Sequence, residues 1–125
     1  MLTRHPSLKL LVAFFCIVAL FAVAQQKAEG APPALFYSLL SLNHSKEESL
    51  KRAQAAVASE VSGKLMKRAD DVALVNPDFN LAVHCRATGS KTCFVTIIVA
   101  HRSSFPEAKG LALNIRRGME TGIFE

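Results

Sequence analysis

The most constraining feature of the sequence is a pair of alternating segments that meet at Gly89, each carrying one cysteine. Apolar side chains recur at every second position on both sides of this glycine, which is the period of a half-buried β-strand. Folding the chain about Gly89 predicts an antiparallel hairpin over residues 79–101. Its three-residue loop, Thr88 to Ser90, suits a type I turn with Gly89 or a neighbour near the left-handed region.

Pairing that is symmetric about Gly89 sorts the hairpin side chains onto two faces. The predicted apolar pairs are Cys85 with Cys93, Val83 with Val95, Leu81 with Ile97 and Phe79 with Val99. The mixed face carries Arg86 with Thr92, His84 with Phe94, Ala82 with Thr96 and Asn80 with Ile98. A one-residue slip would turn one apolar set to the wrong side, which constrains the register. Cys85 and Cys93 are therefore predicted to form a disulfide, which would contribute roughly 2.5 kcal/mol on the chain-entropy estimate.

Residues 1–24 have the order of a secretory signal peptide. Arg4 and Lys9 precede the uninterrupted apolar stretch from 10 to 24, and Ala22 and Ala24 fit the small-x-small pattern of a cleavage site. The stretch has 15 residues, whereas a membrane-spanning helix needs about 20. Cleavage after Ala24 is therefore favoured over a retained anchor. The sequence predicts an exported protein, periplasmic or extracellular, with no permanent membrane span once the signal is removed.

The chain after the signal peptide fits one small domain behind a linker. Residues 25–33 contain Gly30, Pro32 and Pro33 among small and polar residues, which predicts a flexible linker, and residues 34–125 are predicted to form the domain. Without the leader, 13 Lys and Arg stand against 10 Asp and Glu, a net charge of +3. These charges are interspersed and lack the aromatic-lined basic face of a nucleic-acid-binding domain. Nucleic acid is therefore not an expected partner.

Two helices are predicted from serine caps. Ser45 followed by Glu48 forms a capping box that starts a helix at Lys46, and Gly63 is its natural stop. Its apolar stripe consists of Leu50, Ala53, Val57 and Val61. Ser104 with Glu107 repeats the pattern for a C-terminal helix, which Gly118 or Gly122 ends. The buried stripe of this second helix consists of Ala108, Leu111, Ala112, Ile115 and Met119.

These elements predict an α+β fold, with one antiparallel sheet of three or four strands and both amphipathic helices packed on one face. Residues 34–42 are apolar and bounded by prolines and Asn43, which fits a strand or a short buried helix, and the strand is favoured. Residues 72–75 form another predicted strand, closed by the turn at 76–78. The predicted order is strand, helix, strand, the two hairpin strands, helix.

With this plan the chain resembles small exported bacterial α+β domains of unknown function. The resemblance rests on the segment Ser45 to Ala53, on Cys85 at the end of a strand, on the strand Val95 to Ala100 and on the capped C-terminal helix. It covers most of residues 35–119. It implies the fold and the compartment, and it transfers no functional residue.

The sequence predicts a non-enzymatic protein without a cofactor or a metal. His84 precedes Cys85, but neighbours on a strand point to opposite faces, so the imidazole cannot act as a base for the thiol. A metal would need His44, His84 and His101 to converge with a carboxylate, and their predicted places are far apart.

The predicted interaction surface is the sheet face that two helices cannot cover. It is either exposed or covered by residues 35–42 or by a second copy, and its central residues are His84, Phe94, Thr96 and Ile98. The first hypothesis is an accessory or binding module that contacts an unknown protein partner, or itself, through this face. The alternative is an inhibitor of another exported enzyme, acting through the turn Thr88 to Lys91.

Overall fold

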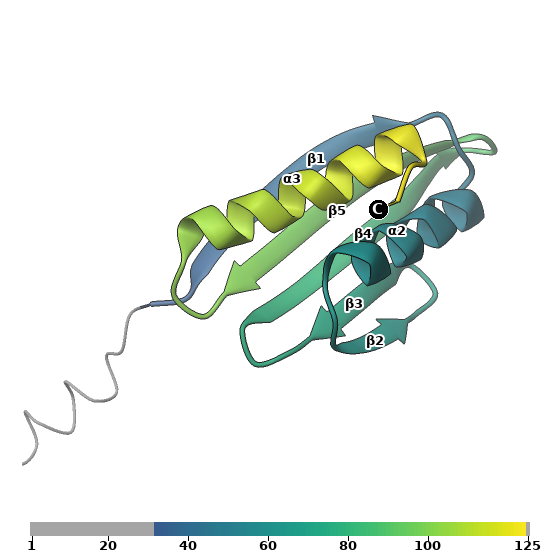
Figure 1. The fold of residues 1–125 in the computed structure, drawn as a ribbon. Coiled ribbons are helices and arrows are strands. Elements are labelled where there is room, and N and C mark those ends of the chain that lie inside the picture. The colour runs from purple at the N-terminus through teal and green to yellow at the C-terminus, as the bar shows by residue number, and fades with distance from the viewer. Residues whose placement is uncertain (1–31, 125) are drawn as a thin grey trace, which may run out of the picture. The chain divides into compact units, whose positions relative to one another are not determined.

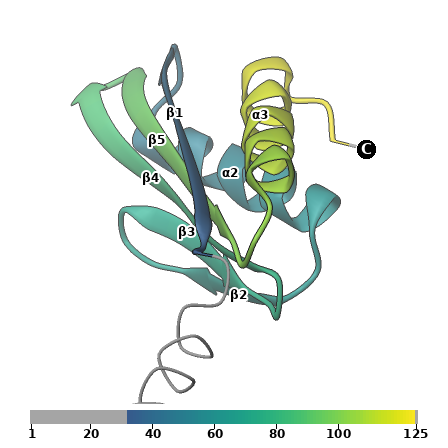
Figure 2. The ribbon, with the colours of Figure 1, turned by 90° about the vertical axis from the view of Figure 1, so that its left-hand side faces the viewer.

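Five antiparallel strands form one sheet, and two helices lie on the same side of it (Figures 1 and 2). The computed structural model describes residues 32–124, so the predicted signal peptide and most of the predicted linker lie outside the described residues. The elements are β1 (Ala34–Leu42), α2 (Lys46–Glu60), β2 (Lys64–Lys67), β3 (Asp71–Val75), β4 (Phe79–Gly89), β5 (Thr92–His101) and α3 (Phe105–Thr121). The strands follow the order β1-β5-β4-β3-β2 across the sheet. Neither helix in this range is long and apolar enough to cross a membrane.

The predicted α+β class, with an antiparallel sheet and two helices, is confirmed, whereas the predicted strand number and order are not. The prediction of three or four strands missed β2, which pairs with β3 at the sheet edge. Four residues are too few to establish an alternating pattern. Gly63 does not cap α2 as predicted, because that helix ends at Glu60 with Val61 as its cap. A Cβ atom at Gly63 would lie 2.7 Å from the carbonyl oxygen of Val75, so glycine permits the close approach of β2 to β3.

Both predicted serine caps are present. The Ser45 hydroxyl accepts a hydrogen bond from the Glu48 amide at 3.1 Å, and the Ser104 hydroxyl accepts one from the Glu107 amide at 3.3 Å. Gly122 ends α3 in the left-handed region with φ of 69°. Each cap satisfies backbone groups that a helix leaves without an intrahelical partner.

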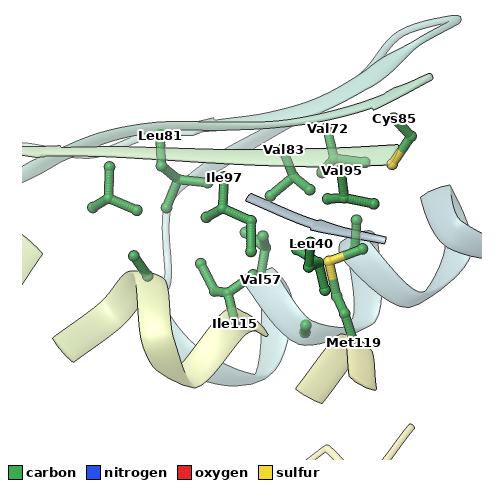
Figure 3. Close-up of a cluster of buried hydrophobic side chains, with 14 of the residues drawn as sticks. Leu40, Val57, Val72, Leu81, Val83, Cys85, Val95, Ile97, Ile115 and Met119 are labelled. Atoms are coloured by element: carbon green, nitrogen blue, oxygen red, sulfur yellow. The ribbon is translucent and has the colours of Figure 1, made fainter. Parts of the chain in front are cut away.

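The core lies between the helices and the inner face of the sheet (Figure 3). α3 packs over β1 and β5, and α2 packs over β4 and β3. The predicted stripe of α3 is buried throughout, and that of α2 is buried except for the partly exposed Val61. The sheet contributes branched residues that are fully buried, among them Val72, Val83, Val95, Ile97 and Val99.

The hairpin of β4 and β5 forms in a register that differs from the predicted one by two residues. Val83 lies opposite Ile97, Leu81 opposite Val99, Phe79 opposite His101 and Cys85 opposite Val95. The four predicted apolar pairs are therefore wrong. A shift of two residues leaves every side chain on its predicted face, so the alternating pattern cannot distinguish these registers.

The turn explains the shift. The strands continue to Gly89 and Thr92, which leaves Ser90 and Lys91 as a two-residue loop. The register changes between Ala87 and Gly89, where Thr88 is the extra residue. Among residues 32–124, positive φ occurs at Gly122 alone. The predicted three-residue loop with a left-handed residue near Gly89 is therefore wrong.

Candidate interaction surface

Alternate residues of all five strands build the sheet face that the helices leave uncovered, which we call the open face (Figure 2). It consists of Leu35, Tyr37, Leu39 and Ser41 on β1; Phe94, Thr96, Ile98 and Ala100 on β5; Asn80, Ala82, His84 and Arg86 on β4; Asp71, Ala73 and Val75 on β3; and Lys64 and Met66 on β2.

The structure brings together the four face residues that the sequence singles out, His84, Phe94, Thr96 and Ile98. Thr96 lies opposite His84, where the predicted register had placed Phe94. Phe94 lies instead opposite Arg86, whose guanidinium carbon is 5.6 Å from the centre of the phenyl ring. This geometry allows a cation–π contact that partly covers the ring from one side.

β1 extends the open face instead of covering it. Residues 35–42 were a possible cover in the sequence, but β1 pairs with β5 in the plane of the sheet along its whole length. Leu35, Tyr37 and Leu39 point to the open side and are 58%, 64% and 47% exposed. Sequence reasoning missed them because residues 35–40 show no alternation of apolar and polar side chains, and their one serine, Ser38, is buried on the helix side.

The open face divides into an uncharged part and a charged part. β1 and β5 contribute no ionisable group to it except the Tyr37 phenol, and we call Leu35, Tyr37, Leu39, Phe94 and Ile98 the apolar strip. The charged residues come from the other three strands. Asp71 is held by Arg68, whose Nε lies 2.6 Å from Oδ1.

Each edge of the sheet carries a feature that opposes pairing with another strand. Beside β1, the Arg116 guanidinium of α3 donates hydrogen bonds to Ser38 Oγ at 2.9 Å and to the Leu39 carbonyl oxygen at 3.3 Å. Its Nε lies 2.8 Å from Glu120 Oε1, which holds the side chain in place. At the other edge, β2 has only four residues and a lysine at each end. Short strands, lysines and charged groups placed on an edge all oppose strand addition.

Cys85 and Cys93 are free thiols buried beneath the helices (Figure 3), so the predicted disulfide is not present in the structure. The observed register places the two cysteines on a diagonal, because Cys85 faces Val95 and Cys93 faces Ala87. Burial, with the neighbouring Cys93 adding to it, raises the pKa of the Cys85 thiol to about 12. At neutral pH this sulfur is protonated and therefore a poor nucleophile.

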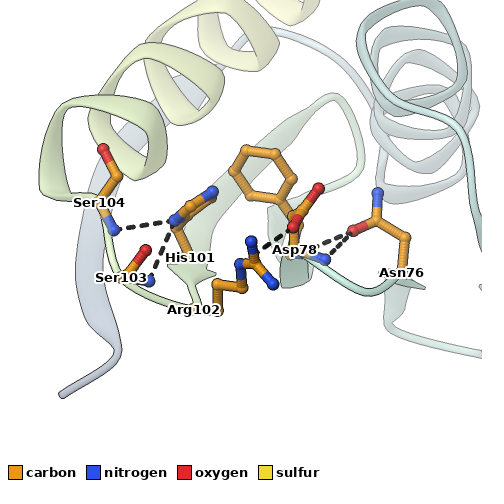
Figure 4. A network of polar contacts seen from close by, with 7 residues as sticks. Asn76, Asp78, His101, Arg102, Ser103 and Ser104 are labelled. Atoms are coloured by element: carbon orange, nitrogen blue, oxygen red, sulfur yellow. Dashed lines mark hydrogen bonds and ion pairs between the residues drawn. The ribbon is translucent and has the colours of Figure 1, made fainter. Parts of the chain in front are cut away.

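His101 orders the loop between β5 and α3 (Figure 4). Its Nδ1 accepts hydrogen bonds from the amides of Ser103 at 3.1 Å and Ser104 at 2.8 Å. The imidazole also packs edge-on against Phe79, with the ring centres 4.8 Å apart. Nδ1 and the packing of the ring against Phe79 therefore serve to hold this loop in place. Within the described part of the chain, no three His, Cys, Asp or Glu side chains cluster in a way that would hold a metal ion.

The neighbouring turn between β3 and β4 is fixed by a second polar group (Figure 4). Asn76 Oδ1 accepts hydrogen bonds from the amides of Asp78 at 2.9 Å and Phe79 at 2.7 Å. Asp78 in turn forms an ion pair with Arg102, with Nε and Oδ1 3.2 Å apart. These contacts join the two loops at this end of the sheet.

No protein-family model matches the chain, and a search of curated proteins gives no match either. The open face and the residues that surround it are therefore the basis for a functional proposal.

Proposed function

We propose that the protein is an exported, non-enzymatic binding module that acts through protein–protein contact at its open face. The observation that carries the proposal is the apolar strip, in which aromatic and aliphatic side chains on two neighbouring strands remain exposed without a helix above them. Contiguous exposed apolar surface on a small protein is typical of an interaction site.

The sequences of β1 and β5 support the same reading. Antiparallel strands with one solvated face alternate cleanly between apolar and polar residues, whereas strands buried on both faces are apolar almost continuously. Residues 93–100 of β5 are apolar except for Thr96, and β1 is apolar except for Ser38 and Ser41. This composition suits strands that are covered on both sides in the functional state.

The chemistry of the apolar strip defines the class of partner. The Tyr37 phenol provides a hydrogen-bonding group beside an otherwise apolar area, and aromatic residues of this kind are enriched at interfaces. The matching partner is a protein surface that is apolar and nearly free of charge where it meets the strip. The proposal that the protein is exported is based on the signal-peptide pattern of residues 1–24. The intact mass of the purified protein tests it by showing whether the chain is cleaved after Ala24.

Capture of partners from the native exported fraction tests the open face. The bait proteins are the wild type, Ile98→Lys and Leu113→Lys, because Ile98 on the open face and Leu113 on α3 are both 41% exposed. We expect a partner that the wild type and Leu113→Lys retain and that Ile98→Lys loses. Equal retention by all three baits would contradict the proposal.

The alternative, an inhibitory module that binds through the hairpin turn, is favoured by one observation. Every residue from Arg86 to Thr92 is exposed, and the Thr88 and Thr92 hydroxyls are hydrogen-bonded at 2.9 Å across the end of the hairpin. Alanine at Ser90 or Lys91 separates the two functions. Loss of the partner from these variants, with retention by Ile98→Lys, would place binding at the turn.

A further inference from the structure

We infer that the surface covering the open face is a second copy of this chain, so that two protomers associate face to face in a symmetric dimer. The inference rests on the proposed function and names its partner. It is carried by the lack of charge in the apolar strip, by the size of the open face and by the protection of both sheet edges.

A symmetric dimer places the same surface patch of both protomers in one interface. A patch with charge of one sign would repel its own copy, whereas an uncharged apolar patch is compatible with itself. The apolar strip meets this condition, because β1 and β5 place only aliphatic, aromatic, hydroxyl and alanine side chains on the open face. Asp71 and Lys64 lie on strands away from the strip, whereas Arg86 on the neighbouring β4 reaches its margin, where its guanidinium carbon is 5.6 Å from the centre of the Phe94 ring.

Only the open face as a whole, with the apolar strip on β1 and β5 at one side and the charged residues of the other strands beside it, approaches the size of a specific dimer interface. Five strands spaced about 4.8 Å apart, each with about eight residues rising ~3.3 Å, span an area of roughly 600 Å² before side-chain relief is added. A standard interface buries about 800 Å² of accessible surface on each partner. Two such faces stack about 10 Å apart, with their strands roughly 30° from parallel, as in a β-sandwich.

The edges disfavour the other common way in which a sheet protein pairs with itself, which is strand addition. A continuous intermolecular sheet needs a free backbone edge, but Arg116 occupies the Leu39 carbonyl at the β1 edge. β2 is short and begins and ends with lysine. Association through the open face leaves the Arg116 contact at β1 and the lysines of β2 unchanged.

Sedimentation velocity on the purified protein tests the inference at concentrations of ~1 to ~100 μM, which bracket micromolar dissociation constants. We expect the wild type to approach twice the monomer mass as its concentration rises. Ile98→Lys is expected to weaken dimerisation by at least about 100-fold, since it leaves an unpaired charge in the interface. Leu113→Lys is the matched control and is expected to dimerise like the wild type. Added salt is expected to leave the dimer intact, because the apolar strip supplies most of the attraction and salt screens only the charged residues beside it.

A second variant keeps the test decisive if Ile98→Lys does not fold, as judged by circular dichroism. Tyr37→Lys alters the most exposed residue of the apolar strip, which is 64% exposed on an edge strand, and the same loss is expected. A wild type that is monomeric at every concentration would overturn the second copy as the partner. The proposed function would then survive only if capture of a different protein still depended on Ile98. A dimer that persists in both lysine variants would overturn the face-to-face arrangement.

Discussion

The two faces of the sheet are built from similar residues but have different surroundings. On β5, Ile97 is fully buried beneath the helices, whereas its neighbour Ile98 is 41% exposed on the open face. The inner face has two amphipathic helices to cover it, and the open face has no covering element within residues 32–124. Apolar composition alone therefore does not distinguish a core from an interface. A core face is covered by elements of the same chain, whereas an interface is covered by another chain.

Replacing each isoleucine by alanine gives the largest expected contrast between the faces. Ile97→Ala leaves a cavity in the core and is expected to lower the free energy of unfolding by about 3 kcal/mol. Ile98→Ala removes a half-exposed side chain and is expected to cost less than ~1 kcal/mol in dilute protein. Urea denaturation of both variants measures the difference.

Measuring the two alanine variants at several protein concentrations makes the comparison of the faces more specific. If two copies cover the open face, the cost of Ile98→Ala rises as the protein concentration rises, because dimerisation stabilises the folded state. The cost of Ile97→Ala contains a large cavity contribution at every concentration. Similar costs for the two variants in dilute protein would show that the faces do not differ in burial as described.

The sequence predicts which face a residue occupies better than it predicts which residue is its partner. Alternation has a period of two, so it assigned the inward side of β4 and β5 correctly while the register was wrong by two residues. The register depends on the turn, and the extra residue Thr88 leaves no signal in a hydrophobicity pattern. The symmetry of Cys85 and Cys93 about Gly89 predicts that they lie directly opposite each other, but the structure places them on a diagonal.

The helices could be predicted from the sequence, whereas the position of β1 in the open face and the strand β2 could not. Serine caps and apolar stripes are local signals, and both helices begin where these signals place them. The contribution of β1 to the open face depends on its pairing with β5, fifty or more residues away in the chain. β2 depends on the close approach that Gly63 permits. The β1–β5 pairing is non-local and cannot be read from a short window of sequence, whereas β2 pairs locally with β3 but is too short to show an alternating pattern.

Thiol labelling provides a second way to compare the faces. Cys85 is buried and its pKa is raised to about 12, so we expect its labelling, and that of buried Cys93, to require unfolding. Ile98→Cys introduces a thiol on the open face that is expected to react at least about 100-fold faster in dilute protein. A thiol-specific chromogenic reagent measures the rates, and intact mass counts the modified sulfurs. Rapid labelling of Cys85 in the folded wild type would contradict its placement in the core.

The edge beside the open face gives a smaller effect. Arg116→Ala removes the hydrogen bonds to Ser38 and Leu39 and is expected to cost about 1 to 2 kcal/mol. It also frees the β1 edge, so slow aggregation measured by light scattering is expected to increase. Arg117→Ala is the control, because Arg117 is exposed on the same helix and, within the described residues, its guanidinium hydrogen-bonds only Asn114. Equal aggregation of the two variants would show that Arg116 does not protect the edge.

The smallest expected effect comes from an exposed ion pair between α2 and the turn before β3. Lys46 donates a hydrogen bond to Asp70, which lowers the pKa of that carboxyl below its ordinary 3.8, and the same contact raises the pKa of Lys46 above 10.5. The contribution of Asp70 is present above pH 3.8 and is lost as the pH falls through the lowered pKa. The contribution of Lys46 is present below pH 10.5 and is lost as the pH rises through the raised value.

Lys46→Met is therefore expected to flatten the pH dependence of stability at both limits, with a smaller effect at neutral pH than that of Ile97→Ala or Arg116→Ala. Both partners of the pair are accessible to solvent, so solvent and salt screen their attraction. Urea midpoints across the pH range measure the effect, and Lys51→Met, which changes another exposed lysine of α2, is the control. Equal destabilisation by Lys46→Met and Ile97→Ala would mean that charge holds the helices to the sheet. Burial of apolar side chains would then not be what distinguishes the inner face from the open face.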